Sequence, residues 1–466
     1  MDDVMSVVTI PIKTEKWQED ILEKRFKAYR ETYNVLLVKM KKELGKLQHN
    51  PEYMESYQII MSAYDKELSE GERKKIKNSE EYKLAKKRQQ EMLREKGFSQ
   101  FGLIKVAKDY YKYYDMHIPS STVARSITNP MWEAFEKLIF GNGKKVSFKK
   151  MDDFRRIASD GKSGLRIVDE NGKTVFSGSE KKKLYVSFGT RGNKILTMPI
   201  AVPKKDIYKA AMLERTWKVV SIVRKKIKYR YRYFVQLTIV GAPEKKVNRK
   251  TGEDLHPIKT GKLGIYIDSR YVVVCDETKN CHTYDLLEFS QLHENEIVEL
   301  SRYMDNSRRV NNPENFNSDG TIKKGIIKNG KRRRLYWKNS RKYYRAKDKV
   351  ADLYRKDSET RKIQRNVLAN TILSMGDDIV INDFPFELAK QRKKKDELTK
   401  KGTPKSKKKA GATIQKTAPS ALVTTMEAKL AAKENSKISK VKLENINKEE
   451  KNYRENYARL LVEWVR

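Results

Sequence analysis

The first part of the chain has the spacing of apolar residues that is typical of helices. Val7 to Pro11 alternates like a short strand, and from Glu15 to Gly45 apolar residues recur every three or four positions, which predicts a long helix with one buried face. Further helices are expected over residues 51–116 and over Ser120 to Phe140. Pro130 is expected to kink or interrupt the last helix, because proline lacks a backbone N–H.

From Lys144 the period changes from helical to strand-like. The apolar runs become short and are separated by Gly, Asn and Asp turns. Five or more short strands at this spacing predict a small barrel. The expected strands are Val146 to Phe148, Leu165 to Val168, Thr174 to Phe176, Leu184 to Phe188, Ile195 to Ile200, Trp217 to Val223 and Tyr229 to Val240.

The last of these strands alternates aromatic and basic side chains. Tyr229, Tyr231 and Tyr233 alternate with Arg230 and Arg232. Such a pattern suits stacking on bases or contact with an RNA backbone. A barrel wall with a charged outer face explains the pattern equally well, so both interpretations stay open.

A polar linker over residues 242–258 precedes a new set of elements. Leu263 to Ile267 and Tyr271 to Cys275 are apolar, β-prone runs separated by a turn at Asp268-Ser269, which predicts two paired strands. The later elements expected are a helix over Leu286 to Val310, a loop over Asn311 to Gly320, a long helix over Trp337 to Met375, a buried strand over Ile379 to Phe384, a flexible basic loop over 390–410, and helices over Pro419 to Ala432 and Asn452 to Arg466.

Composition adds a strong preference for a polyanionic partner. The chain has 466 residues with a hydrophobic content of 38%, enough for two or three packed domains. Lys and Arg total 102 against 61 Asp and Glu, which gives a formal charge of +41. Nucleic acid is the expected partner, because Lys and Arg that neutralise phosphates release condensed counterions. No run approaches the ~20 apolar residues of a membrane span, so an intracellular, cytoplasmic protein without membrane contact is expected.

The two cysteines, Cys275 and Cys281, give little sign of a metal site. His282 lies beside the second cysteine. A zinc ribbon needs two cysteine pairs, and the chain has no Cys-x-x-Cys motif. Buried or free thiols are therefore expected.

Several segments resemble the transposon-encoded TnpB family and the related type V CRISPR effectors, which are RNA-guided nucleases with a RuvC domain. The Asn-rich stretch Asp305 to Ile322 and the stretch Trp337 to Tyr343 are similar to the segment joining the first two catalytic strands in one TnpB branch. Ala410 to Ile414 and Thr417 to Ser420 resemble that branch's Phe-Gly-Lys-Ser-Ile and Arg-Ala-Pro-Gly motifs. The similarity covers most of the chain and is densest from 217 to 432.

The resemblance implies a multidomain α+β fold. Residues 1–14 and 144–258 would form a small β-barrel (WED-like) domain, with a helical recognition (REC-like) lobe of residues 15–143 inserted in it. Residues 259–466 would form an RNase-H-like α/β RuvC domain, degenerate and without a zinc ribbon. In nucleases of that fold, a carboxylate on the first strand helps to hold two Mg²⁺ ions about 4 Å apart.

The positions that match the family's catalytic carboxylates carry other residues. Lining up Gly264-Ile265 with the family's Gly-Ile-Asp places Tyr266 at the first catalytic Asp, and aligning Ile379 to Phe384 with the second motif places Asn382 at the catalytic Glu. Glu455 is the nearest match to the third carboxylate, an Asp in the family. Two of the three formal charges that bind Mg²⁺ are then missing, because Tyr has a pKa near 10 and Asn is uncharged. No magnesium is expected at this site, and the nuclease is predicted to be inactive.

Two nearby carboxylates leave an alternative, an active endonuclease with relocated ligands. Asp268 shares a strand face with Tyr266 but lies about 6.6 Å along it, whereas Asp383 follows Asn382 and points to the opposite face. Mg²⁺ requires near-octahedral ligands at about 2.1 Å, so neither replacement is favoured.

The resemblance thus implies an RNA-guided DNA-binding protein with an inactive nuclease site, most like the nuclease-dead TnpB-like repressors (TldR). It would repress transcription by occupying a promoter, with guide RNA and double-stranded target DNA as partners and no other cofactor, as a monomer or as a homodimer on one RNA. Two further alternatives are a nuclease-dead type V effector that recruits a transcription partner and a binding protein without a guide.

Seven arginines are the candidates for contact with nucleic-acid backbones, and a solvated basic face is the competing interpretation for each of them. They are Arg230, Arg232, Arg308, Arg309, Arg332, Arg333 and Arg334.

Overall fold

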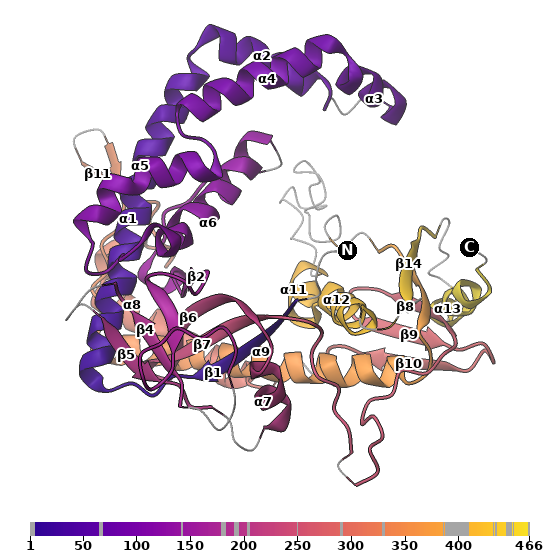
Figure 1. Ribbon diagram of the computed structural model, residues 1–466. Helices are drawn as coiled ribbons and strands as arrows, with labels where there is room; N and C mark the ends of the chain where they lie inside the picture. The colour runs from indigo at the N-terminus through magenta and orange to yellow at the C-terminus, as the bar shows by residue number, and fades with distance from the viewer. Residues whose placement is uncertain are drawn as a thin grey trace. The chain divides into compact units, whose positions relative to one another are not determined.

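The computed structural model divides the chain into two compact units. One comprises Met1–Lys225 with Tyr231–Glu244, and the other comprises Lys226–Arg230 with Lys245–Arg466 (Figure 1). The structure describes residues 5–64, 69–140, 143–178, 183–190, 195–202, 206–248, 250–288, 292–328, 331–384, 386, 410–431, 433, 436–443, 450 and 452–464. Most of the basic loop expected over 390–410 lies outside the described residues.

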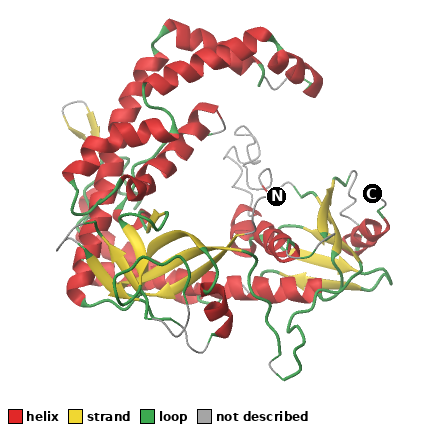
Figure 2. Cartoon of the chain, in the orientation of Figure 1, coloured by secondary structure: helices red, strands yellow, loops and turns green. Residues whose placement is uncertain are grey.

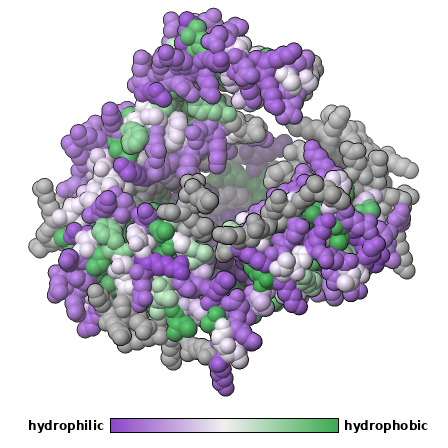
Figure 3. Space-filling model, turned by 45° about the vertical axis from the view of Figure 1, so that its right-hand side comes forward, coloured by the Kyte–Doolittle hydropathy of each residue, from purple (hydrophilic) through white to green (hydrophobic). Residues whose placement is uncertain are grey.

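The first unit begins with a strand and a helical part. Its elements are β1 (Met5–Pro11), α1 (Lys16–Gln48), α2 (Pro51–Ser62), α3 (Glu70–Asn78), α4 (Glu80–Glu95), α5 (Gln100–Tyr113) and α6 (Ser121–Phe140). The prediction of a long first helix is confirmed, and Leu22, Phe26 and Tyr29 on its apolar face are fully buried. The surface over α2, α3 and α4 is mostly hydrophilic in the view of Figure 3.

The block predicted over 51–116 is divided into four helices by polar caps. Asn50, Ser69, Ser79 and Ser99 each accept a hydrogen bond from the backbone N–H three residues later. Gly97 adopts a φ of +83° after α4, and a Cβ there would lie 2.7 Å from Val106. The apolar pattern does not mark these ends, because the residues that cap the helices are polar.

Of the expectation that Pro130 kinks or interrupts its helix, the interruption is wrong, since α6 runs without a break from Ser121 to Phe140. A proline removes one backbone hydrogen bond. The buried side chains of Ile127, Met131 and Phe135 hold the helix on both sides of it.

Two sheets form the rest of the first unit. A four-stranded sheet has the order β1-β7-β6-β2, and a three-stranded sheet has the order β3-β4-β5. All their strand pairs are antiparallel. The remaining elements of this unit are η1 (Met151–Asp153), β2 (Arg156–Ser159), β3 (Leu165–Val168), β4 (Tyr185–Phe188), β5 (Leu196–Pro199), α7 (Ile207–Leu213), β6 (Trp217–Ile227) and β7 (Arg230–Val240).

The predicted barrel is not closed within the described part of the chain. The two sheets meet at an isolated bridge between Ile12 and Ile200. The expected strand at Val146 to Phe148 is also wrong, because these residues form no strand. The next residue, Lys149, exchanges backbone hydrogen bonds of 2.9 and 3.0 Å with the side-chain amide of Asn34 on α1.

The second unit is built on a five-stranded mixed sheet with the order β10-β9-β8-β13-β14 (Figure 2). The strands are β8 (Lys262–Ile267), β9 (Tyr271–Cys275), β10 (Cys281–Asp285), β13 (Asp378–Asn382) and β14 (Lys437–Val441). Strands β8, β9 and β10 pair antiparallel, whereas β13 is parallel to both β8 and β14. The other elements are α8 (Glu294–Asn311), η3 (Pro313–Asn315), β11 (Ile326–Lys328), β12 (Lys331–Arg333), α9 (Arg341–Leu373), α11 (Ala410–Thr417), α12 (Pro419–Leu430) and α13 (Tyr453–Glu463).

Helices cover both faces of this sheet. On one face, Leu263, Ile265 and Ile267 belong to a buried cluster with residues of α9 and α12. On the other face, Tyr266, Val273 and Cys275 cluster with Ala458 and Val462 of α13. Successive side chains of a strand point to opposite faces, so β8 contributes to both clusters. A mixed α and β fold of more than one unit, as predicted, is confirmed.

The prediction of free or buried thiols is wrong, because Cys275 and Cys281 form a disulfide. The two residues are directly opposite each other on β9 and β10. The spacing of six residues gave no sign of this pairing, which depends on the hairpin register. Among the described residues, no helix is both long and apolar enough to cross a membrane.

Candidate functional site

The three positions predicted to correspond to catalytic carboxylates lie in one neighbourhood of the second unit. Tyr266 is on β8, Asn382 ends β13, and Glu455 is in the first turn of α13. Ile381 pairs with Ile265, so the next residues, Asn382 and Tyr266, are neighbours across the two strands.

Helix α13 lies directly on β8 because one residue of the strand has no side chain. A Cβ on Gly264 would lie 2.1 Å from the carbonyl oxygen of Ala458 and 2.5 Å from the backbone nitrogen of Val462. Any larger residue at this position would push the helix away. The glycine that suggested the first catalytic strand therefore also sets the position of the last helix.

The side chain of Tyr266 is buried in a cluster of aromatic rings. It is 1% exposed, stacks with Tyr457 at 6.1 Å between ring centroids, and meets Tyr453 edge-on at 5.9 Å. Burial raises the pKa of Tyr266 well above its ordinary value, so the phenol stays protonated and neutral. A neutral phenol in this cluster supplies no anionic oxygen for a metal ion.

Asn382 uses both ends of its amide on the backbone of β8. Its Oδ1 accepts a hydrogen bond from the Ile267 N–H at 2.6 Å, and its Nδ2 donates to the Ile267 carbonyl at 2.9 Å. The side chain is buried, with 5% of the residue exposed. A carboxylate could not make the second bond, because it carries no proton to donate. The amide therefore serves sheet pairing at this position.

Glu455 carries a carboxylate, and its side chain is partly exposed. Its Oε2 lies 3.9 Å from Nη2 of Arg459, one turn later on α13, and both side chains are about two-fifths exposed. An ion pair of this kind contributes at most about 1 kcal/mol to stability. Of the three predicted positions, the third, Glu455, is therefore the one with an anionic side chain.

Asp268, the first alternative ligand, is already engaged. Its Oδ1 accepts hydrogen bonds from the backbone N–H groups of Arg270 at 2.7 Å and Tyr271 at 2.8 Å, which closes the turn after β8. Its Oδ2 accepts a hydrogen bond from Nε of Arg454 at 2.8 Å. Asp383, the second alternative, is exposed beyond the end of β13.

Arg454 is a neighbour of the candidate site that the sequence interpretation did not indicate. Its guanidinium lies 4.5 Å from the ring centroid of Tyr271 and 4.7 Å from that of Tyr453. Burial alone would lower the pKa of Arg454, but the hydrogen bond and charge of Asp268 raise it overall. The position beside Glu455 was the available signal, because the family motif has an arginine before its carboxylate.

These donors do not fit a pair of magnesium ions. Mg²⁺ is held in proteins by carboxylate and water oxygens at about 2.1 Å. Here the neighbourhood offers a neutral phenol, a neutral amide, a carboxylate paired with Arg454 and a partly exposed glutamate. Among the described residues there is no group of three or more His, Cys, Asp or Glu side chains placed to hold a metal ion.

Two of the three tyrosines singled out in this segment face inward, whereas Tyr229, in the turn before β7, is 60% exposed. Tyr233 is 2% exposed and donates its hydroxyl proton to Glu23 at 2.6 Å, and Tyr231 bonds Asp152. Both tyrosines lie on the inner side with the fully buried Arg224, whose guanidinium is 4.6 Å from the Tyr231 ring. Arg230 and Arg232 point outward and are exposed. A charged outer face therefore describes β7 itself, and of the three tyrosines Tyr229 is the one exposed enough to stack on a base.

Two other candidate arginines hold the connection between α8 and α9. The Arg308 guanidinium lies 5.0 Å from the ring centroids of both Trp337 and Tyr343. Arg309 donates to the carbonyl of Gly320 at 2.8 Å. Among the remaining candidates, Arg334 is exposed, and the side chains of Arg332 and Arg333 on β12 lie outside the described part.

Buried asparagines connect the same two segments. Asn312, fully buried, donates to the Lys338 carbonyl at 2.9 Å and accepts from the Lys338 N–H at 2.5 Å. Asn315 donates to the Tyr336 carbonyl at 2.6 Å. The two stretches that resemble the TnpB segment are thus joined by their most distinctive residues.

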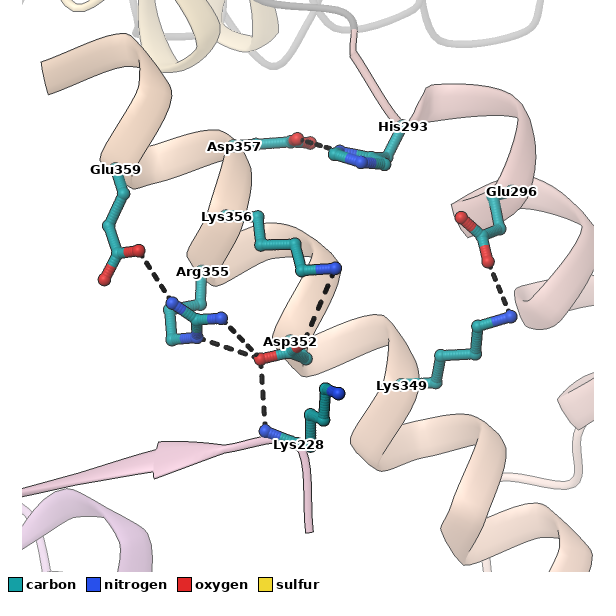
Figure 4. A network of polar contacts seen from close by, with 9 residues as sticks. All are labelled: Lys228, His293, Glu296, Lys349, Asp352, Arg355, Lys356, Asp357 and Glu359. Atoms are coloured by element: carbon teal, nitrogen blue, oxygen red, sulfur yellow. Dashed lines mark hydrogen bonds and ion pairs between the residues drawn. The ribbon is translucent and has the colours of Figure 1, made fainter. Parts of the chain in front are cut away.

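An ionic network on α9 fixes the turn that precedes Arg230 (Figure 4). Asp352 accepts hydrogen bonds from the Lys228 N–H at 3.1 Å and from Nε of Arg355 at 2.9 Å. Burial alone would raise the pKa of Asp352, but these hydrogen bonds and the nearby cations lower it overall. Two further pairs join α9 to the start of α8, His293 with Asp357 at 2.5 Å and Glu296 with Lys349 at 2.6 Å.

Comparison with known proteins gives distant structural similarities. No family model and no curated protein matches the chain. A Cas12f1–sgRNA–target DNA complex is similar, with 11% identity and a TM-score of 0.38 over 95% of this chain and 89% of that one. A Cas12f ternary complex has 12% identity and a TM-score of 0.29, over 92% of this chain and 72% of that one. A Cas12i–crRNA–dsDNA complex has 10% identity and a TM-score of 0.26, over 92% of this chain and 55% of that one. These TM-scores are low, so the similarities decide the role of no residue.

Proposed function

We propose that the chain is an RNA-guided DNA-binding protein without nuclease activity, which represses transcription by occupying a promoter. A guide RNA and double-stranded target DNA are its partners, and one or two copies of the chain bind one RNA. Base pairing between guide and target supplies the sequence specificity, while the protein holds the backbones.

The proposal for nucleic-acid binding is supported by charge and by the organisation of the resembling segments. The formal charge of +41 favours a polyanionic partner. The exposed Arg230 and Arg232 lie on one side of β7 and are available to phosphates. The mixed sheet with helices on both faces is consistent with an RNase-H-like domain.

The proposal of an inactive nuclease is carried by one observation. At the place where the family's first two carboxylates are expected, Tyr266 fills an aromatic cluster and the amide of Asn382 pairs with the backbone of β8. Both side chains have structural partners that a carboxylate could not keep. A role for Asp268 as a relocated ligand would require breaking its hydrogen bond with Arg454.

The first experiment is to sequence the RNA that co-purifies with the full chain. A defined RNA species with a variable end is expected, and the loaded protein should bind DNA matching that end and not a scrambled duplex. A preparation that carries no defined RNA would refute guided binding, whatever the state of the nuclease site.

A further inference from the structure

An exposed basic surface lies where residues 144–150 meet α1 in the first unit. The side chain of Asn34, on α1, exchanges two hydrogen bonds with the backbone of Lys149. Two turns later on the helix, the Nζ of Lys41 lies 5.0 Å from the ring centroid of Phe148. These contacts hold the segment against α1, which is the long helix at the left of Figure 1.

Two large apolar side chains are exposed on this surface. Phe148 is 53% exposed, and Val38 is 56% exposed. Asn34, Val38 and Lys41 follow one another at steps of four and three residues, so Val38 lies between the other two on the face of α1 that meets the segment. A single exposed apolar residue is ordinary on a protein surface. Here an aromatic ring and a valine are exposed together and are surrounded by cations.

The positive charge of this surface has few carboxylates to balance it. Residues 144–150 contain four lysines and no acidic residue. Asp152 and Asp153, which follow, already accept hydrogen bonds from other groups. On the nearby part of α1, the carboxylate of Glu43 pairs with Lys46 at 2.8 Å. The exposed lysines closest along the chain to Phe148 and around its contact on α1 are Lys41, Lys42, Lys144, Lys145 and Lys150.

A glycine inside α1 leaves open space beside these lysines. Gly45 lies one turn beyond Lys41, on the same face of the helix by its spacing. Glycine weakens a helix interior relative to alanine. A Cβ at Gly45 would have no atom within 4 Å, so packing inside the protein does not require the glycine there. A ligand that approaches the helix closely at this point would require it.

We propose that this surface binds a single strand of nucleic acid, with one unpaired base stacked on Phe148 and the neighbouring phosphates on the lysines. Sites for single strands combine aromatic rings, which stack on bases of any sequence, with basic side chains that follow the backbone. A duplex keeps its bases paired and would leave the ring uncovered. The inference rests on the nucleic-acid binding in the proposed function, and it depends neither on a guide nor on the state of the nuclease site.

Photocrosslinking locates the base directly. The full chain is washed at high salt to remove bound RNA and is then mixed at low salt with a short oligouridylate or oligothymidylate that carries one 5-iodouracil. Under irradiation, 5-iodouracil loses iodine and bonds to an aromatic ring on which it stacks. Peptide mass spectrometry should find the adduct on Phe148 in higher yield than on Phe101. Phe101 is an exposed phenylalanine on α5 with no lysine within three residues along the chain.

The two probes and a duplex distinguish the source of the base. An adduct with the RNA probe, with the DNA probe or with both supports the proposal, and the probe with the higher yield identifies the strand that fits better. The DNA probe annealed to its complement should give little adduct on Phe148, because its base is paired.

Gly45→Gln tests the surface without a change at Phe148. Glutamine is a better helix former than glycine, so the variant should fold. Its side chain fills the open space beside Lys41 and should lower the adduct on Phe148 about fivefold, the value of one lost base stack. Gly71→Gln is the matched control, because Gly71 is also a helical glycine, on α3, whose Cβ would have no atom within 4 Å. It should leave the yield unchanged.

Three results would overturn the proposal. Both probes bind but Phe148 carries no more adduct than Phe101, the duplex labels Phe148 as strongly as the single strand does, or Gly45→Gln leaves the yield unchanged. Filter binding with the same probes separates these results from a failure of the proposed function. If the full chain retains neither probe, nucleic-acid binding itself is refuted.

Discussion

Asn382 and Tyr266 show how side chains at two neighbouring positions serve the interior of the second unit. The amide of Asn382 continues the pairing of β13 with β8 by donating to and accepting from Ile267. Tyr266 fills the space between β8 and α13 together with Tyr453 and Tyr457. A carboxylate at position 382 would place an unpaired charge beside a carbonyl group, and a carboxylate at position 266 would place one among aromatic rings.

Replacing the amide by a carboxylate of the same shape, Asn382→Asp, should destabilise the protein by about 3 kcal/mol at neutral pH, because the Ile267 carbonyl loses its donor and faces a charge. The protonated acid can still donate, so the folded state should raise the pKa of this carboxyl. The variant should therefore approach the parent stability at acid pH and lose it as the pH rises. Urea unfolding at several pH values measures this, with the exposed Asn306→Asp as control. A variant as stable as the parent at neutral pH would contradict the structural role of the amide.

Restoring the family's residue with Tyr266→Asp should destabilise the protein by about 3–5 kcal/mol, because it removes a buried aromatic ring and buries a charge. Tyr266→Phe keeps the ring and should cost only about 1 kcal/mol, the value of the hydrogen bond between the hydroxyls of Tyr266 and Tyr453. The denaturant midpoints of the parent, Tyr266→Asp and Tyr266→Phe measure these differences. A large loss of stability in Tyr266→Asp alone would indicate a packing role for the ring. Equal stability of Tyr266→Asp and the parent would show that the position tolerates a carboxylate.

At the scale of elements, the long periodic segments could be predicted and the short ones could not. The apolar stripe of α1 and the paired runs of β8 and β9 are visible in the sequence, because burial of one or both faces imposes their periods. The divisions between α2, α3, α4 and α5 depend on single capping residues. The residues expected as a strand at 146–148 form none, and the adjacent Lys149 pairs with Asn34, which is more than one hundred residues away in the chain.

The sequence singled out the residues of the candidate site, but it could not predict their contacts. The match of Gly264-Ile265 to a family motif pointed to Tyr266, and the structure places Asn382 beside it. The ion pair of Arg454 with Asp268 joins two segments 186 residues apart, and no local pattern encodes such a distance. The disulfide was missed for the same kind of reason, because it follows from the register of β9 with β10.

The ionic network on α9 gives a pH-dependent prediction for an element. Asp352→Asn should lower stability by about 1–2 kcal/mol at pH 7, because it removes the charge that holds the Lys228 N–H and Arg355. The folded state lowers the pKa of Asp352, so its contribution is present above the pKa of the unfolded chain and is lost as the pH falls. The difference between parent and variant should therefore shrink below about pH 4. Thermal unfolding from pH 3 to pH 8 measures it, and the exposed Asp305→Asn should show no such trend. A difference that persists unchanged at pH 3 would assign the effect to something other than the charge.

At the scale of the whole molecule, the positive charge and the lack of carboxylates at Tyr266 and Asn382 support the proposed activity. The formal charge of +41 supplies affinity for nucleic acid that depends strongly on salt. In the second unit, Tyr266 packs in the interior and Asn382 pairs with the backbone of β8. Binding without cleavage is the combination that these two features predict together.

The most direct measurement incubates the RNA-loaded full chain with matched double-stranded DNA and Mg²⁺ and follows binding and strand integrity in the same samples. We expect retention of the matched duplex, loss of retention with a scrambled duplex, and intact strands in both. Guide-dependent cleavage of the matched duplex that is abolished by Asp268→Ala would contradict the proposed binding without cleavage.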